Sequence, residues 1–158
     1  MVNLGHKADE RGTPNEDAVL SFPCTRFISP AMAQSIDFGD DSSEYANDFE
    51  CDDRRFVGNG MATGLDWDDA GHDATDCRHA YELGTIKLWN QSKASAATQC
   101  SAISYGNDTS DYARDGTCDD PRFEGPGTDS VMLPDELGRD ATDCKKACEM
   151  GTAFIRNY

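Results

Sequence analysis

Aspartates at regular spacing are the residues of this sequence that could do chemistry. Seven of them recur 67 residues further along the chain. Carboxylates crowded into a small fold repel one another, and a divalent cation that prefers oxygen ligands relieves this repulsion. The recurring residues are Asp41, Asp48, Asp52, Asp53, Asp68, Asp73 and Asp76, and their counterparts are Asp108, Asp115, Asp119, Asp120, Asp135, Asp140 and Asp143.

The sequence predicts one calcium ion for each group, or about two Ca2+ per chain. The candidate ligands are the recurring aspartates other than Asp68 and Asp135. Calcium accepts six to eight oxygens in irregular geometry, whereas magnesium requires a stricter octahedron. Zinc is less suitable because it prefers thiolate and imidazole, and the chain has only three histidines and no CxxC pair. The alternative without metal is an acidic, solvated surface with helix caps.

An internal repeat places these aspartates. Residues 38–91 align with 105–158 without a gap, and 25 of the 54 pairs are identical. The identical positions include Cys, Tyr, Phe, Arg and Gly, so a shared acidic composition does not explain the match. We call the two segments the first and the second copy. The expected organisation is an N-terminal extension (1–34), repeat 1 (35–91), a linker (92–104) and repeat 2 (105–158).

The cysteine spacing predicts three disulfide bonds. Two pairs at equivalent positions have the same separation of 26 residues. Each would join an aspartate-rich loop to the helix that follows it. Cys148 lies one helical turn after a paired cysteine, and Cys100 is its expected partner. Cys24 is left over, and it is either buried and free or bridged to another chain. The expected bonds are Cys51–Cys77, Cys118–Cys144 and Cys100–Cys148.

Short helices and strands are expected around each loop. Asp73 and Asp140 should be the N-caps of helices over 74–83 and 141–150, with Gly84 and Gly151 as left-handed residues at their C-terminal ends. Strands are expected over 85–89 and 152–155, and also over 35–38 and 101–105. The segment between Cys51 and Asp73 has no sustained period and is interpreted as an ordered loop. The expected fold class is a small disulfide-rich α+β protein of two tandem repeats, each with an Asp/Gly-rich metal-binding loop, one short helix and short flanking strands.

Three further sets of residues have expected structural roles. The arginines that follow the acidic cluster in both copies are expected to form salt bridges with it, rather than to bind a substrate. Four aromatic residues are expected to make the small core of each copy. Two tryptophans occur in the first copy only, and they either pack between the copies or mark a surface for a partner. These sets are Arg55 and Arg122; Phe56, Phe123, Tyr45 and Tyr112; and Trp67 and Trp89.

Two short stretches resemble a known family. The pattern D-G-x-C-D at 115–119 and the pattern D-x-x-D-C at 140–144 resemble the Notch-type (LNR) repeat and, more loosely, the LDL-receptor class A repeat. Both are small extracellular modules that disulfides hold around one calcium ion with acidic ligands. The repeat also resembles Asp/Cys motifs of secreted bacterial proteins, which implies a location but no activity. The resemblance implies as ligands Asp115, Asp119, Asp140 and Asp143, and in the first copy Asp48, Asp52, Asp73 and Asp76.

The composition excludes several classes of function. With 30 acidic and 14 basic residues the net charge is −16, which argues against nucleic-acid binding because phosphate contacts need Lys and Arg. No apolar run is long enough for a membrane span. Leu, Ile, Val and Phe together number only 23 of 158 residues, so disulfides and bound ions are expected to supply stability that a large core would otherwise give.

We therefore expect a secreted, extracellular or cell-envelope protein that acts in structure or binding and is not an enzyme. A protein partner or self-association is expected, and no nucleic acid. One alternative is a self-assembling subunit of an extracellular filament or larger complex, in which Cys24 and residues 1–34 clasp a neighbouring chain. A second alternative is a small acid–base hydrolase, which requires a carboxylate-lined cleft.

Overall fold

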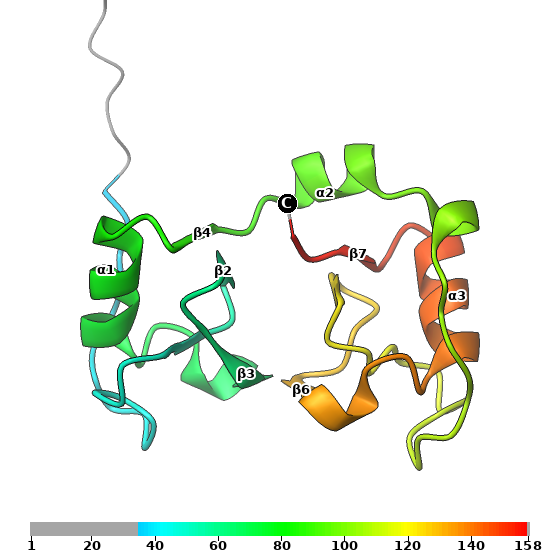
Figure 1. The fold of residues 1–158 in the computed structure, drawn as a ribbon, viewed down its shortest axis with the longest axis horizontal. Coiled ribbons are helices and arrows are strands. Elements are labelled where there is room, and N and C mark those ends of the chain that lie inside the picture. Colours follow the sequence, from blue (N-terminus) through cyan, green and yellow to red (C-terminus); the bar gives the residue numbers. More distant parts are fainter. Residues whose placement is uncertain (1–34, 158) are drawn as a thin grey trace, which may run out of the picture. The chain divides into compact units, whose positions relative to one another are not determined.

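Residues 35–157 are described by a computed structural model, and Cys24 and the expected N-terminal extension lie outside them. Within this range the chain forms three α-helices and seven short strands (Figure 1), which confirms a small α+β fold. The helices are α1 (Ala74–Glu82), α2 (Gln91–Ala97) and α3 (Ala141–Glu149). The strands are β1 (Cys51–Asp53), β2 (Phe56–Gly58), β3 (Met61–Asp66), β4 (Ile86–Leu88), β5 (Phe123–Glu124), β6 (Val131–Met132) and β7 (Phe154–Ile155).

Helices α1 and α3 confirm the two predicted helices. Each is followed by a glycine in the left-handed region, Gly84 with φ 73° and Gly151 with φ 71°, as the expected C-terminal signal requires. The predicted capping role of Asp73 and Asp140 is wrong. Both residues occupy the N-cap position, but neither side chain bonds to the first turn of its helix. Each carboxylate instead accepts a bond from a backbone N–H before the helix, that of Asp52 or Asp119.

Of the predicted strands, only the two that follow α1 and α3 in the chain are confirmed. Strand β4 pairs with β2, and β7 pairs with β5, both antiparallel. No strand forms over 35–38, and residues 100–102 form a 3₁₀ helix in place of the expected strand over 101–105. The segment interpreted as a loop before Asp73 contains β1, β2 and β3. The expected linker contains α2, whose N-cap residue Asn90 accepts a bond from the backbone N–H of Lys93 at 2.9 Å.

Each copy has a small core around one phenylalanine and one disulfide. Phe56 and Phe123 are fully buried, as predicted. Phe38 stacks on Phe56 with 5.5 Å between ring centroids, and Tyr105 stacks on Phe123 at 5.8 Å. The predicted core role of Tyr45 and Tyr112 is wrong, because about half of each side chain is exposed. All three predicted disulfides are present: Cys51–Cys77, Cys118–Cys144 and Cys100–Cys148.

The two copies join through one strand pair and one buried ion network. Strand β3 of the first copy pairs antiparallel with β6 of the second, in the register Leu65–Met132. Buried Glu124 accepts bonds from Arg54 Nε at 2.9 Å and from Arg156 Nη1. Trp67 lies at the same junction, with its ring centroid 5.3 Å from the Arg54 guanidinium. Arg54 belongs to the first copy, as Trp67 does, and the contact of Trp67 with the second copy is the bond from its backbone N–H to the carbonyl oxygen of Ser130 at 3.1 Å.

The two buried arginines at this junction share one carboxylate, Glu124, and backbone carbonyl oxygens accept most of their remaining bonds. Arg54 Nη1 donates to the carbonyl oxygens of Asp129 and Ser130, both at 2.6 Å. Arg156 Nη2 donates to the carbonyl oxygens of Arg54 and Phe56, at 3.1 and 2.8 Å. Hydrogen bonds to charged groups of this kind are stronger than neutral ones, which makes the network a specific connection between the copies.

None of the helices in residues 35–157 has the length and apolar character needed to cross a bilayer.

Candidate metal centre

Two groups of four aspartates surround the equivalent disulfides, and they hold eight of the twelve predicted metal ligands. Cluster 1 consists of Asp48, Asp52, Asp73 and Asp76, and cluster 2 consists of Asp115, Asp119, Asp140 and Asp143.

Backbone hydrogen bonds draw cluster 1 together. The N–H of Asp52, on β1, donates to Asp73 Oδ2 at 2.8 Å, so the strand is tied to the start of α1. The N–H of Phe49 donates to Asp76 Oδ2 at 3.1 Å, which ties the loop before β1 to the first turn of the same helix. Asp48 belongs to this loop and is exposed, whereas the other three aspartates are buried. The cluster is therefore a buried group of carboxylates with one exposed member.

Cluster 2 has the same connections. The N–H of Asp119 donates to Asp140 Oδ2 at 2.9 Å, and the N–H of Gly116 donates to Asp143 Oδ2 at 3.0 Å. Asp115 is exposed in the preceding loop, as Asp48 is in cluster 1. The structure thus brings together in both copies the aspartates that the family resemblance implied.

Burial and mutual repulsion raise the pKa values in cluster 1. Loss of hydration on burial, followed by the charges of Asp48 and Asp73, raises the pKa of Asp52 to about 7. Burial, with smaller contributions from Asp76 and Asp48, raises the pKa of Asp73 to about 6. One oxygen of each carboxylate, Oδ2 of Asp52 and Oδ1 of Asp73, is buried without a hydrogen-bond partner. Without a hydrogen-bond donor or a positive charge beside them, burial favours the protonated form of these carboxyl groups.

Cluster 2 shows the same perturbation. Burial first, then Asp115, Asp129, Asp140 and Glu136, raises the pKa of Asp119 to about 7. The pKa of Asp140 is also raised, by burial and then by neighbouring carboxylates of the cluster. Oδ2 of Asp119 and Oδ1 of Asp140 are buried without a partner, at the positions equivalent to the two orphaned oxygens of cluster 1.

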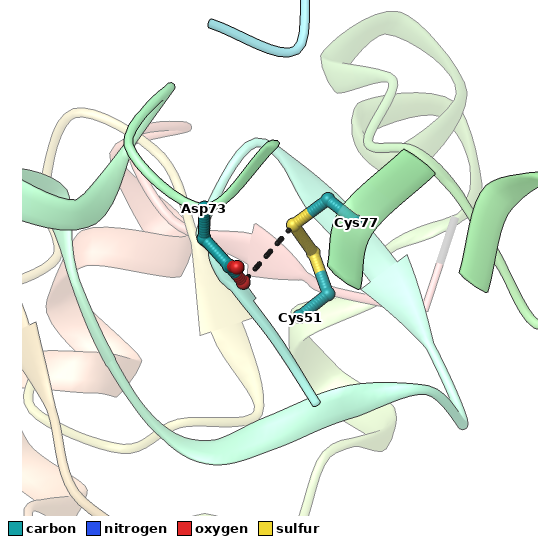
Figure 2. A group of neighbouring side chains, drawn as sticks. All are labelled: Cys51, Asp73 and Cys77. Atoms are coloured by element: carbon teal, nitrogen blue, oxygen red, sulfur yellow. Dashed lines mark hydrogen bonds between the residues drawn. A yellow bond between two sulfur atoms is a disulfide. The ribbon is translucent and has the colours of Figure 1, made fainter. Parts of the chain in front are cut away.

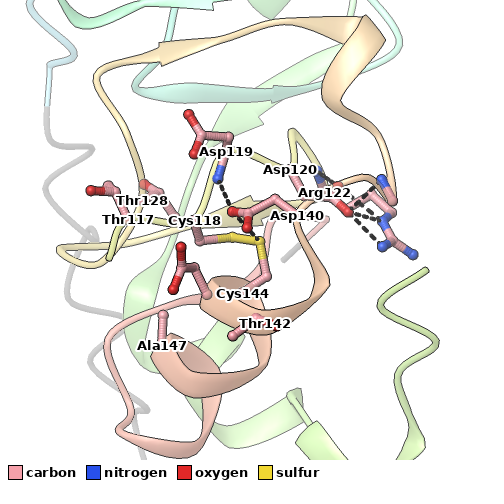
Figure 3. The surroundings of a disulfide bond; sticks show 12 residues. Thr117, Cys118, Asp119, Asp120, Arg122, Thr128, Asp140, Thr142, Cys144 and Ala147 are labelled. Carbon is pink, nitrogen blue, oxygen red and sulfur yellow. Dashed lines mark hydrogen bonds and ion pairs between the residues drawn. A yellow bond between two sulfur atoms is a disulfide. The ribbon is translucent and has the colours of Figure 1, made fainter. Parts of the chain in front are cut away.

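Two predicted ligands per copy lie outside the clusters. Asp53 and Asp120 are buried, but their carboxylates bind the expected arginines. Arg55 Nε donates to both oxygens of Asp53 at 2.9 Å, and Arg122 Nε donates to both oxygens of Asp120 at 3.0 Å (Figure 3). The predicted salt bridges of Arg55 and Arg122 are thereby confirmed. Because a guanidinium already neutralises each of these carboxylates, they offer no free oxygen to a metal ion.

Asp41 and Asp108 provide the helix caps that Asp73 and Asp140 do not. Asp41 Oδ1 accepts from the backbone N–H of Thr75, in the first turn of α1, and its Oδ2 accepts from the Thr75 hydroxyl, both at 2.7 Å. Asp108 holds Thr142 of α3 in the same way and at the same distances. These bonds, supplemented at Asp108 by an ion pair with Arg114, occupy both oxygens. The structure therefore places these two predicted ligands as caps.

The central aspartate of each cluster also lies against its disulfide (Figure 2). Asp73 Oδ2 is 3.5 Å from Cys77 Sγ, and Asp140 Oδ2 is 3.5 Å from Cys144 Sγ. Two Cys/Asp/Cys groups could hold a metal ion, since their ligand atoms lie within 4.8 Å of one another: Cys51, Asp73, Cys77 and Cys118, Asp140, Cys144. The cysteines are joined as disulfides, however, and a disulfide sulfur is not the thiolate that zinc requires. In the oxidised protein the aspartate oxygens are the suitable ligands.

Acidic residues that the sequence analysis missed line two cavities beside the clusters. A cavity of about 500 Å³ adjoins cluster 1 and includes Asp52, Tyr45, Asp66 and Asp69 in its lining. A cavity of about 250 Å³ adjoins cluster 2 and is lined by Tyr112, Asp119, Asp129, Val131, Leu133 and Glu136. Two of these residues, Asp69 and Glu136, occupy equivalent positions of the two copies and are both acidic. This signal could have identified them, but a count of identical aspartates overlooks it.

No family model, curated protein or solved structure matches this chain. Its function is therefore inferred from the chemistry of the two clusters.

Proposed function

We propose that this chain is a secreted calcium-binding protein with a structural or interaction role, in which clusters 1 and 2 each bind one calcium ion. The observation that carries the proposal is the set of buried carboxylate oxygens without partners at equivalent positions of both clusters. Four oxygens share this state: Asp52 Oδ2, Asp73 Oδ1, Asp119 Oδ2 and Asp140 Oδ1.

A bound cation would compensate the ionised carboxylates of the clusters, because no basic side chain does so. Among residues 35–157, none of the salt bridges involves a carboxylate of either cluster. Burying ionised carboxylates without a counter-charge costs several kcal/mol for each group, on the order of the penalty for an unpaired buried ion. A hard divalent ion bound to carboxylate oxygens removes this cost. Calcium suits the clusters because it tolerates irregular geometry and several acidic ligands.

The cell compartment and the repeat organisation are part of this proposal. Three disulfides are consistent with an oxidising, extracellular environment. The resemblance of residues 115–119 and 140–144 to Notch-type repeats supports two disulfide-tied modules, each stabilised by its own calcium ion. Such modules serve as rigid surfaces, and this chain would bind a protein partner or a second copy of itself. A filament subunit linked through Cys24 is the alternative form of this role.

Metal-dependent unfolding tests the proposal. Oxidised protein is stripped with EGTA, dialysed, and heated with increasing free calcium, magnesium or zinc. We expect calcium to raise the unfolding free energy by about 2.7 kcal/mol per site at a hundredfold excess over the dissociation constant, and magnesium to act at much higher concentration. A melting curve unaffected by calcium, together with no calcium in elemental analysis of the native protein, would contradict the proposal. Stabilisation of reduced protein by zinc alone would instead favour the Cys/Asp/Cys groups.

A small acid–base hydrolase is a second candidate, favoured by the cavity of about 500 Å³ beside Asp52, whose pKa is about 7. A carboxyl group with such a pKa in a cleft is suited to proton transfer. The pKa of Asp119 is also raised to about 7, although the cavity beside Asp119 has only about half the volume. The raised pKa therefore does not depend on the larger cavity, which argues against a hydrolase. Turnover of chromogenic glycosides or peptides that persists in EGTA and is lost in Asp52→Asn would support the hydrolase.

A further inference from the structure

One pocket at the junction of the copies has a wall without acidic side chains. Its volume is about 380 Å³, and it differs in this respect from the two cavities beside the clusters, which acidic residues line. Among residues 35–157, the only charged side chains in its wall are those of Arg122 and Arg156. Most of the remaining wall is apolar and consists of Pro121, Pro134, Leu137 and Ile155. In a chain of net charge −16, this pocket is the one suited to an anion with an apolar body.

Arg156 brings a positive charge to this pocket that the protein does not balance. Arg156 is only 7% exposed, and it shares one carboxylate, that of Glu124, with the fully buried Arg54. Two buried positive charges therefore meet one negative charge. Burial, together with the charge of Arg54 and in spite of Glu124, lowers the pKa of Arg156 to about 10. An additional anion beside Arg156 would compensate the excess charge.

One N–H donor of Arg156 is also without a partner. Nη1 donates to Glu124, and Nη2 donates to the carbonyl oxygens of Arg54 and Phe56. Nε makes no hydrogen bond with any residue of the range 35–157. It is not one of the fully enclosed polar atoms that lack a partner, so a ligand in the pocket can reach it. A carboxylate would accept from this N–H and also supply the missing negative charge.

The other arginine of the wall is already neutralised. Arg122 Nε donates to both oxygens of Asp120, as described above. The site is also confined to the second copy, because the position equivalent to Arg156 is Trp89 in the first. The excess charge and the open donor are therefore found together once per chain.

We propose that this pocket binds one small monocarboxylate with an apolar body, of the size of a medium-chain fatty acid. The carboxylate accepts from Arg156 Nε, and the apolar body packs on the wall that Leu137 and Ile155 provide. None of the aspartates of clusters 1 and 2 lines the pocket. The inference thus goes beyond the proposed function and does not depend on bound calcium.

Calorimetric titration with octanoate tests the site. We expect one octanoate per chain, with the same affinity in EGTA and in calcium. Octanamide has the same apolar body without the charge, and acetate has the charge without most of the apolar body. Each should bind at least tenfold more weakly than octanoate, because the site combines a charge-assisted hydrogen bond with apolar burial.

Two variants and one matched control locate the binding. Arg156→Gln removes the charge and should weaken octanoate binding at least tenfold, with melting curves to check that the variant is folded. Leu137→Glu leaves the buried network intact, since the 57% exposed Leu137 lies in the wall and not among the groups that bond to Arg156. Its new charge should repel octanoate and weaken binding at least tenfold. The control Leu83→Glu changes a 65% exposed leucine of the first copy and should keep the parent affinity.

Several outcomes would overturn the inference. These are no octanoate binding by the parent, equal binding of octanamide or acetate, and parent affinity in Leu137→Glu. Each of them would leave the calcium titration of clusters 1 and 2 unchanged. Failure of this inference is therefore distinguishable from failure of the proposed function.

Discussion

Replacing Asp73 by asparagine should have opposite effects with and without calcium. Asp73 Oδ2 accepts from the backbone N–H of Asp52, and an amide oxygen can keep this bond. The orphaned Oδ1 would become an amide NH2 that can donate to neighbouring carboxylates of cluster 1. In the metal-free protein, Asp73→Asn therefore removes a repelling charge and fills a missing hydrogen bond. With calcium present, the same change removes one negative ligand.

The size of both effects follows from the site. A rise of the Asp73 pKa from 3.8 to about 6 corresponds to roughly 3 kcal/mol at about 1.4 kcal/mol per pKa unit. Solvent that reaches the cluster at exposed Asp48 screens part of this, so we expect a gain of about 1–2 kcal/mol in EGTA at pH 7. Loss of a charged ligand should weaken calcium binding at least tenfold, which lowers the stabilisation by saturating calcium by at least about 1.4 kcal/mol.

Urea unfolding in EGTA and in calcium measures both quantities, and Asp41→Ala is the matched control. Asp41 is also an aspartate of the first copy, but its carboxylate caps α1 through Thr75. Its removal should cost about 1 kcal/mol equally in both conditions. An Asp73→Asn variant that loses the same stability in both conditions would refute the reasoning, because Asp73 would then behave as a cap and not as a ligand.

Three other predictions concern pH, backbone strain and the junction between the copies. Burial raises the pKa of Asp52 and Asp119 from 3.8 to about 7. In EGTA these two groups should therefore stabilise the folded state below pH 4, and this stabilisation should be lost as the pH rises to about 7. Melting curves in calcium should not show this loss. Phe49 is 92% exposed and has a φ of 80°, and the equivalent position 116 is a glycine. Phe49→Gly should therefore raise the free energy of unfolding in urea by up to about 1 kcal/mol. A lower free energy of unfolding would show that the Phe49 ring makes a stabilising contact. Glu124→Gln leaves two buried arginines without a counter-charge and should cost about 3–5 kcal/mol; a loss below 1 kcal/mol would show that the network contributes little.

Local and repeated signals were sufficient to predict α1, α3 and the disulfides, but not α2. Gly84 and Gly151 mark the ends of α1 and α3 because each adopts a backbone conformation that other residues rarely reach. Equal cysteine spacing at equivalent positions favoured Cys51–Cys77 and Cys118–Cys144, since each bond then closes a loop of the same length within its own copy. The aspartates of clusters 1 and 2 were found for the same reason, because they are among the residues that recur.

The errors concern residues whose role depends on distant partners. The cap of α1 comes from Asp41, which is 34 residues from Thr75, and no local pattern reveals such a bond. The short strand β1 is stabilised by parallel pairing with β3 and has little sequence signal of its own. Had β1 been predicted, successive side chains would have been placed on opposite faces. Asp52 and Asp53 would then have been separated, one toward the cluster and one toward Arg55.

The division between identical and differing positions has a physical basis. Each copy needs its own disulfide, its own cluster and its own arginine behind it, so these residues recur. Contacts between the copies cannot recur in the same way, because the two sides of the junction face each other and must be complementary. Arg54 stands opposite Glu124, whereas their counterparts in the other copy are Pro121 and Val57, which carry no charge. A comparison of the two copies therefore identifies the residues that make contacts within one copy, and it does not identify the residues that connect the copies.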